Sequence, residues 1–245
     1  MPATWRPSRR MVAAGSLPAA AAALGCRFAT AFRAVVEVGR VRAGEWVAVH
    51  GCGGVGLSAV LVARACGARV VAVDVNPDAL DLARRLGAEA FVDAGRVGPG
   101  SPGPAQPEVV AAAVRAAAGA PVALSLDALG SAATCAASIA GLAPRGRHVQ
   151  VGLLPAVLGW PAVPLHLVVA GELEVLGSHG MAARSYPAML GMVAAGRLRP
   201  QDLVTRRIRL EDAGPALAAM GSSPQAGLTI AVPERRRPGA RTLPA

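Results

Sequence analysis

The chain has 245 residues, of which 53% are hydrophobic and only 3% aromatic. A chain of this length buries roughly 70–75% of its unfolded surface, which predicts one large domain, or one and a fraction, with a core of alanine, valine and leucine. The cysteines show no C-x-x-C spacing, which argues against a zinc knuckle or a redox pair and favours a reducing, cytoplasmic compartment. They are Cys26, Cys52, Cys66 and Cys135.

The formal net charge of +10 comes mainly from the two ends of the chain. All 25 basic residues are arginines, and seven of them lie within residues 1–10 and 234–245. Without these seven and Glu234, 18 arginines face 14 acidic residues, which is an ordinary balance. No aromatic residues alternate with the terminal arginines, so we expect a disordered tail over 234–245 and no nucleic-acid partner.

The amino end allows two interpretations. Ser8, Arg9 and Arg10 precede an apolar run that ends at Leu24, which resembles a twin-arginine export signal. The run is too short to span a membrane, so no membrane partner is expected. Cleavage would cut through a sequence pattern that begins at Ala21, and we therefore favour a cytoplasmic protein.

The stretch 46–57, WVAVHGCGGVGL, predicts a buried strand over 46–51, a glycine turn and a helix over 54–65. Gly51 permits a sharp turn, Gly53 removes a side chain where a diphosphate approaches, and Gly56 lets helix and strand pack closely. The free N–H groups of the first helical turn then face the phosphates. The predicted phosphate-binding residues are Gly51, Gly53, Gly54, Val55 and Gly56.

An acidic residue ends the next predicted strand, 68–75, because Asp74 stands 23 positions after Gly51. A carboxylate there accepts hydrogen bonds from a ribose 2′-hydroxyl and repels a 2′-phosphate, which favours NAD over NADP. The alternative is that Asp74 caps the helix that begins near Asn76.

Strands and helices alternate through the middle of the chain. The strands are continuous apolar runs, which predicts an α/β fold with a doubly wound parallel sheet of the Rossmann type. We expect the remaining strands of this sheet over 90–93, 121–127, 147–153 and 173–177, and its other helices over 77–87, 107–118 and 131–142. Residues 95–107 contain many glycines and prolines and predict a surface loop. Outside the sheet domain we expect helices over 185–195 and 211–220 and strands over 204–210 and 227–232.

From Ala21 to about Val232 the chain resembles the medium-chain, zinc-dependent alcohol dehydrogenases. The resemblance rests on AALGCRFATAFRAVVEVGRVRAGEWVAVHGCGGVGLSA, VVAVDVNPDALDLARRLGA, RGRHVQVGLL and GSHG. It implies that Cys26 is a catalytic zinc ligand and that Thr30 lies beside the nicotinamide. It also implies that Val151, Gly152 and Leu153 line the nicotinamide pocket, with 176–178 at its edge.

The chain departs from the family at several points. The family carries a GroES-like catalytic domain ahead of the matching segment, with two further zinc ligands, whereas some twenty residues precede it here. A cation that the family places near Leu228 is also missing. A catalytic zinc needs three protein ligands, and no histidine is spaced as a pair with Cys26; His179 is the best candidate.

The sequence therefore predicts the coenzyme-binding portion of a truncated NAD-dependent alcohol dehydrogenase, acting on an alcohol or aldehyde. We expect remnants of the catalytic domain over 1–27 and 178–233, a dinucleotide-binding domain over 28–177, and a homo-oligomer formed through the edge strand at 173–177. Two alternatives stay open. One is a zinc-independent quinone or enoyl reductase, which Cys26 argues against; the other is a non-catalytic NAD-binding subunit.

Overall fold

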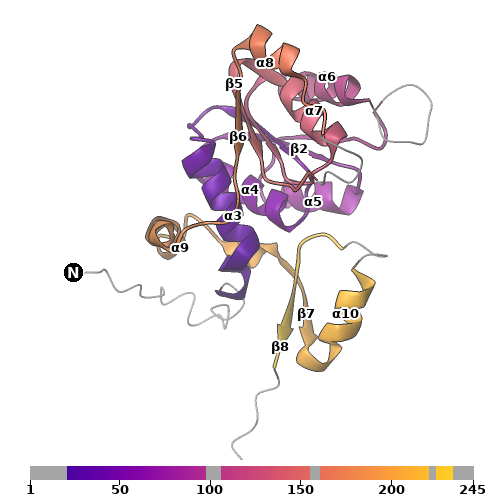
Figure 1. Ribbon diagram of the computed structural model, residues 1–245. Coiled ribbons are helices and arrows are strands. Elements are labelled where there is room, and N and C mark those ends of the chain that lie inside the picture. Colours follow the sequence, from indigo (N-terminus) through magenta and orange to yellow (C-terminus); the bar gives the residue numbers. More distant parts are fainter. Residues whose placement is uncertain (1–20, 98–105, 155–160, 221–224, 234–245) are drawn as a thin grey trace, which may run out of the picture.

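The computed structural model describes residues 21–97, 106–154, 161–220 and 225–233. At its centre lies a parallel sheet with the strand order β3-β2-β1-β4-β5-β6 (Figure 1). The strands are β1 (Trp46–His50), β2 (Arg69–Asp74), β3 (Ala90–Asp93), β4 (Val122–Asp127), β5 (Leu142–Gln150) and β6 (Glu174–Gly177). The order reverses between β1 and β4, so their carboxyl ends open a crevice where such sheets bind ligands. The predicted doubly wound Rossmann fold is confirmed.

Helices cover both faces of the sheet (Figure 1). On one face α4 (Gly54–Ala65) and α5 (Pro77–Arg85) share an apolar core with the amino-terminal helical segment. On the other face α6 (Pro107–Ala118) and α7 (Ala132–Ala140) pack over a second core. Alternate residues of β1 belong to the two cores, Val47 and Val49 to the first and Ala48 to the second, which explains why this strand is apolar throughout.

Two features of the sheet differ from the sequence prediction. The predicted helix over 131–142 ends at Ala140, and the strand expected over 147–153 instead spans Leu142–Gln150. The strand continues through Pro144 and Gly146, with Arg145 at a φ of +59° and an irregular register against β4. The strand ends early because the N–H groups of Val151 and Gly152 both turn to the carbonyl oxygen of Asp127.

Helical structure also occurs where none was predicted. Residues 24–38 form a helical segment with π-helical turns at Leu24–Phe28 (η1) and Arg33–Val38 (η2) on either side of α3 (Ala29–Phe32), and with a kink at Gly25, whose ψ of −151° is not helical. A short helix, α8 (Leu165–Gly171), precedes β6. Of the predicted loop over 95–107, residues 98–105 lie outside the described residues, as do 1–20 and 234–245, and Pro107 already belongs to α6.

The last third of the chain forms a separate small layer beside the sheet domain (Figure 1). Strands β7 (Val204–Arg209) and β8 (Leu228–Val232) pair in parallel, connected by a 3₁₀ turn at Leu210–Asp212 (η5) and by α10 (Ala213–Ala219). The predicted helix over 211–220 is therefore split. Helix α9 (Tyr186–Ala194) lies between short 3₁₀ turns at Ala183–Ser185 (η3) and Pro200–Leu203 (η4). Among the described residues, no helix is long and apolar enough to cross a membrane.

Candidate dinucleotide site

The glycine turn connects β1 to α4 at the crevice. Gly51 has a φ of +86°, a conformation that glycine adopts without a steric penalty. A Cβ atom on Gly56 would lie 1.8 Å from the carbonyl oxygen of Gly51, whereas one on Gly53 would meet no atom within 4 Å. The turn thus needs Gly56 for close packing, and space is open in front of Gly53.

The amino end of α4 is electrically positive and uncapped. Gly53 occupies the cap position without a side-chain hydrogen bond, and the first turn contains no acidic residue. The side chain of Arg27 lies directly against this end: a Cβ atom on Gly54 would be 3.0 Å from its Nη1. A guanidinium beside a positive helix end is unfavourable unless an anion joins them, so this corner is suited to a phosphate. No sequence motif had indicated a role for Arg27.

The carboxylate of Asp74 reaches back to the glycine turn. Its Oδ2 accepts a hydrogen bond from the backbone N–H of Cys52 at 2.5 Å, and its Oδ1 accepts one from that of Asn76 at 2.8 Å. Asn76 itself caps α5, because its side chain accepts the N–H of Asp78. Asp74 is therefore not the cap of α5, and its oxygens retain lone pairs for further donors.

The Cys52 side chain is part of the core. Its Sγ lies 3.8 Å from the carbonyl oxygen of Val73, and burial, followed by the Asp74 carboxylate, raises the pKa of the thiol far above its ordinary range. A protonated thiol is a poor nucleophile. This cysteine is 1% exposed and fills space in the glycine turn.

Large apolar side chains are exposed around the crevice. Val75 follows β2 and is 65% exposed, Leu129 follows β4 and is 63% exposed, and Leu153 follows β5 and is 75% exposed. Exposed apolar groups at the carboxyl ends of three strands fit flat rings of a ligand. Only Leu153 had been predicted as a site residue; a bulky apolar residue one or two positions after the strand was the signal for the other two.

The predicted nicotinamide residues lie in different environments. Val151 and Gly152 are half-buried in the loop after β5, and Thr30 is buried in α3. Cys26 is exposed. A cavity of about 740 Å³ is lined on one side by Cys26, Arg27, Gly53, Gly54 and Val55. Its other side is lined by residues of β7, α10 and β8. The structure thus brings Cys26 to the glycine turn.

The histidines do not complete a zinc site. In the described part of the chain, no three histidine, cysteine or acidic side chains gather closely enough to hold a metal ion. His50 and His148 are buried in the sheet, and burial lowers both pKa values, that of His50 to about 4. His179 and His166 are exposed, and the carbonyl oxygen of His179 accepts a hydrogen bond from Arg33. The described residues therefore do not fit a catalytic zinc.

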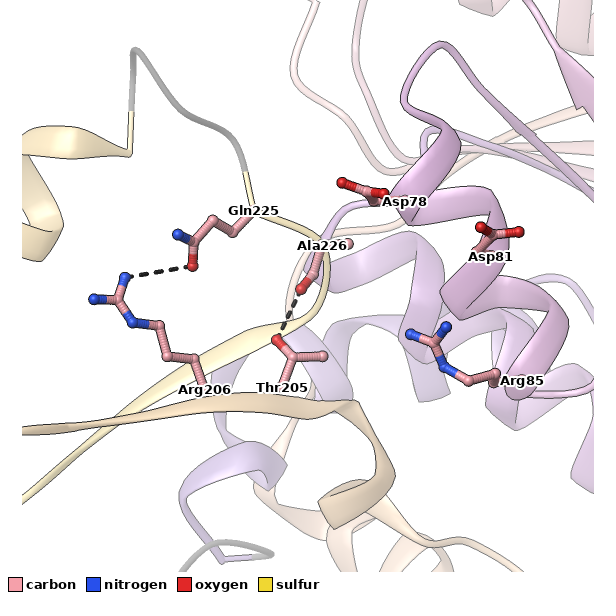
Figure 2. Close-up of a pocket in the computed structure, with 7 residues that line it drawn as sticks. All are labelled: Asp78, Asp81, Arg85, Thr205, Arg206, Gln225 and Ala226. Carbon is pink, nitrogen blue, oxygen red and sulfur yellow. Dashed lines mark hydrogen bonds between the residues drawn. The ribbon is translucent and has the colours of Figure 1, made fainter.

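A second, polar pocket of about 500 Å³ lies between α5 and the loop that leads into β8. Figure 2 shows Asp78, Asp81 and Arg85 on α5 across from Thr205, whereas the Arg206 side chain turns toward Gln225. Thr205 Oγ1 donates to the carbonyl oxygen of Ala226 at 2.8 Å. None of the glycine-turn residues lines this pocket, but Arg206 and Gln225 line both it and the larger cavity.

Comparison with known proteins agrees with the fold and the glycine turn. A family model described as zinc-binding dehydrogenase matches residues 54–195. The chain is 28% identical over 214 residues to an NAD-dependent alcohol dehydrogenase of Sulfurisphaera tokodaii, which covers 87% of this chain and 57% of that protein. It is 32% identical to 5-exo-hydroxycamphor dehydrogenase of Pseudomonas putida, which covers 82% of this chain and 54% of that protein.

Solved structures show the same relationship. The alcohol dehydrogenase of Thermus sp. ATN1 superposes with a TM-score of 0.74 at 29% identity, over 87% of this chain and 58% of that one. The chain thus spans little more than half the length of the relatives it matches. Because the family model covers more than half of the chain, this protein belongs to the zinc-binding dehydrogenase family.

Proposed function

We propose that this chain binds NAD at the glycine turn and contributes the coenzyme-binding part of an alcohol dehydrogenase. The observation that carries the proposal is the pairing of an uncapped helix amino end with the Asp74 carboxylate, bonded to the same turn. Helix N–H groups and Arg27 provide donors for a diphosphate, and Asp74 offers acceptors for the adenosine ribose.

The nicotinamide half of the cofactor is assigned to the loop after β5. Val151, Gly152 and Leu153 would line it, with Thr30 on the opposite side. NAD bound there would supply the acceptor for the hydride of an alcohol carbon. The residues of this chain bind and orient the cofactor for that transfer, with an alcohol or aldehyde as the expected small-molecule substrate.

Cys26 remains a proposed zinc ligand that lacks partners among the described residues, so no step of the proposed function depends on the metal. Its position in the cavity beside the glycine turn supports the assignment. A zinc-independent quinone or enoyl reductase lacks this cysteine, which keeps that alternative second. A non-catalytic NAD-binding subunit is the third reading.

We further propose that two copies pair through β6 in the cytoplasm. This edge strand has an exposed Val175, and α8 beside it exposes Leu165 and Val169. The edge strand of a sheet can form backbone hydrogen bonds with the edge strand of a second copy, and exposed apolar side chains beside it favour such an interface. Light scattering of the chain and of Val175→Asp tests this: a dimer that becomes a monomer supports it, and a monomeric wild type contradicts it.

Calorimetric titration of the purified chain with NAD and with NADP tests the main proposal. NAD binding with clearly weaker NADP binding is the expected result, because Asp74 repels a 2′-phosphate. No heat and no thermal protection with either cofactor would refute it. Turnover of a panel of alcohols with zinc and NAD separates the dehydrogenase from the non-catalytic subunit.

A further inference from the structure

A line of polar side chains crosses the buried centre of the sheet domain. Ser125 and Asp127 on β4, Ser138 on α7 and His148 on β5 are each fully buried, and Gln150 at the end of β5 joins them. Burying so many polar groups is costly unless each is hydrogen-bonded. The pattern of their hydrogen bonds shows what the line holds in place.

The direction of each hydrogen bond follows from Gln150. Its Nε2 lies 3.0 Å from Asp127 Oδ2 and 2.7 Å from the carbonyl oxygen of Gly152. Both partners accept only, so this atom is the amide nitrogen and Gln150 Oε1 must accept from His148 Nε2 at 3.1 Å. His148 Nδ1 then accepts from Ser138 Oγ at 2.8 Å, and Ser125 Oγ donates to Ser138 at 2.7 Å. Burial, which lowers the pKa of His148, keeps it neutral.

Gln150 and Asp127 together hold the loop after β5. The carbonyl oxygen of Asp127 accepts the N–H groups of Val151 and Gly152 at 3.0 and 2.8 Å, while the Gln150 amide binds the carbonyl oxygen of Gly152. The carboxylate of Asp127 holds the neighbouring loop through the N–H groups of Leu129 and Gly130, both at 2.9 Å.

The two loops also touch without spare room. A Cβ atom on Gly152 would lie 2.2 Å from the nitrogen of Gly130, and one on Gly130 would lie 2.3 Å from the carbonyl oxygen of Leu153. The loop after β5 therefore cannot move toward β4, and Gln150 prevents it from moving away. Leu153 is held at the crevice with its side chain in solvent.

We propose that Gln150 is a positioning residue, which acts through Gly152 to hold the Val151–Leu153 loop against the nicotinamide ring. The inference rests on the proposed function, since it assigns the other half of the same cofactor. The diphosphate and adenosine are bound elsewhere, by the glycine turn and Asp74. Gln150 should therefore affect the nicotinamide end of the cofactor and leave the adenosine end untouched.

Comparing NADH with ADP-ribose isolates that end, because ADP-ribose has the same diphosphate and adenosine without the ring. The full chain and Gln150→Met are titrated with both ligands by calorimetry, and the emission of bound NADH is recorded. Gln150→Met should weaken NADH binding by about tenfold, the effect of losing roughly one hydrogen-bonded contact, with ADP-ribose affinity within about twofold of wild type. The emission of bound NADH should also move toward that of free NADH.

Two further variants keep the test decisive. Gln106→Met makes the same substitution at an exposed position before α6 and should change neither affinity. Leu153→Ala trims an exposed side chain, so folding is not at risk even if Gln150→Met unfolds. It should lower NADH affinity and leave ADP-ribose affinity unchanged.

Three results would overturn the proposal while leaving NAD binding intact. The first is that Gln150→Met loses affinity for NADH and for ADP-ribose to the same extent. The second is that Leu153→Ala leaves the ratio of the two affinities unchanged. The third is that the wild type binds NADH no more tightly than ADP-ribose. A wild type that binds neither ligand overturns the proposed function itself, and this inference with it.

Discussion

The carboxylate of Asp74 accepts a hydrogen bond from the backbone N–H of Cys52, which joins the end of β2 to the glycine turn after β1. The two residues are 22 positions apart in sequence, and the bond places a negative charge beside the donors that face a diphosphate. The proposed recognition of ribose and phosphate is therefore one connected structure. Its separate parts can be tested by single substitutions.

Replacing Asp74 by alanine should weaken NAD binding by about 1.5–3 kcal/mol, the usual contribution of hydrogen bonds to a charged group. It should also narrow the preference for NAD over NADP, because the repulsion of a 2′-phosphate is lost. Calorimetry with both cofactors measures the two effects. Asp81→Ala, an exposed acid on α5, is the control. Equal NAD affinity in wild type and Asp74→Ala would refute the ribose assignment.

Gly56→Ala should destabilise the fold and abolish NAD binding. The added methyl group would lie 1.8 Å from the carbonyl oxygen of Gly51, so the helix must move away from the strand at a cost of about 1–3 kcal/mol or more. Gly191→Ala in α9 is the matched control, since its methyl group meets nothing within 4 Å, and it should gain about 0.5–1 kcal/mol. Denaturant unfolding compares the two; similar stabilities would contradict the close packing.

Arg27→Ala should lower NAD affinity by about 1 kcal/mol, less than for Asp74 because the guanidinium is exposed. The loss should shrink as salt is raised, since added ions screen exposed charges. Arg207→Ala makes the same change of charge at an exposed position on β7 and should have little effect. Calorimetric titrations with NAD at low and high salt measure these effects. An identical loss of NAD affinity in Arg27→Ala and Arg207→Ala would argue against a specific phosphate contact.

Cys26→Ala should leave NAD affinity nearly unchanged, because the thiol is assigned to metal and is exposed at the edge of the cavity. Zinc content of the purified protein, measured together with the calorimetry, is the relevant second readout. A large loss of NAD affinity would mean that this thiol supports the nucleotide site directly.

The stability of the domain should fall in mild acid because of His50. Burial lowers its pKa from 6.5 to about 4, so between these pH values the unfolded chain binds a proton that the folded chain does not. The free energy of unfolding is therefore highest, as far as His50 is concerned, above about pH 6.5, and it falls by about 3 kcal/mol as the pH is lowered to 4. Neither ring nitrogen of His50 has a hydrogen-bond partner among the described residues, so His50→Leu should flatten the pH dependence. Unfolding curves of both proteins between pH 4 and 6.5 give the free energy of unfolding at each pH. If this free energy falls equally steeply in wild type and in His50→Leu, the assignment to His50 is wrong.

The glycine turn was predictable because its signals are local. Gly51, Gly53 and Gly56 stand within six residues, and a strand and a helix of the expected period flank them. Asp74 could be assigned to the same site because the number of residues between the glycine turn and the acidic residue after the next strand varies little in such folds.

The buried polar line could not be predicted, since its members are distant in sequence and ordinary in type. His148 was one of four unexplained histidines, and Gln150 lay within a strand predicted with the wrong limits. The limits were wrong because Pro144 and Gly146 usually interrupt a strand, whereas here β4 supplies partners on both sides of the irregularity. Arg27 escaped notice because its role depends on how residues 24–28 fold against α4.

The close contact between Gly130 and Gly152 limits the substitutions that can be used to redesign this protein for another cofactor. Neither position tolerates a side chain, so random libraries spent there would return only glycine. Val75, by contrast, directly follows Asp74 and is 65% exposed, so a larger or charged side chain there would meet no steric barrier of this kind. Engineering toward NADP should therefore begin at the adenosine end and leave the paired glycines alone.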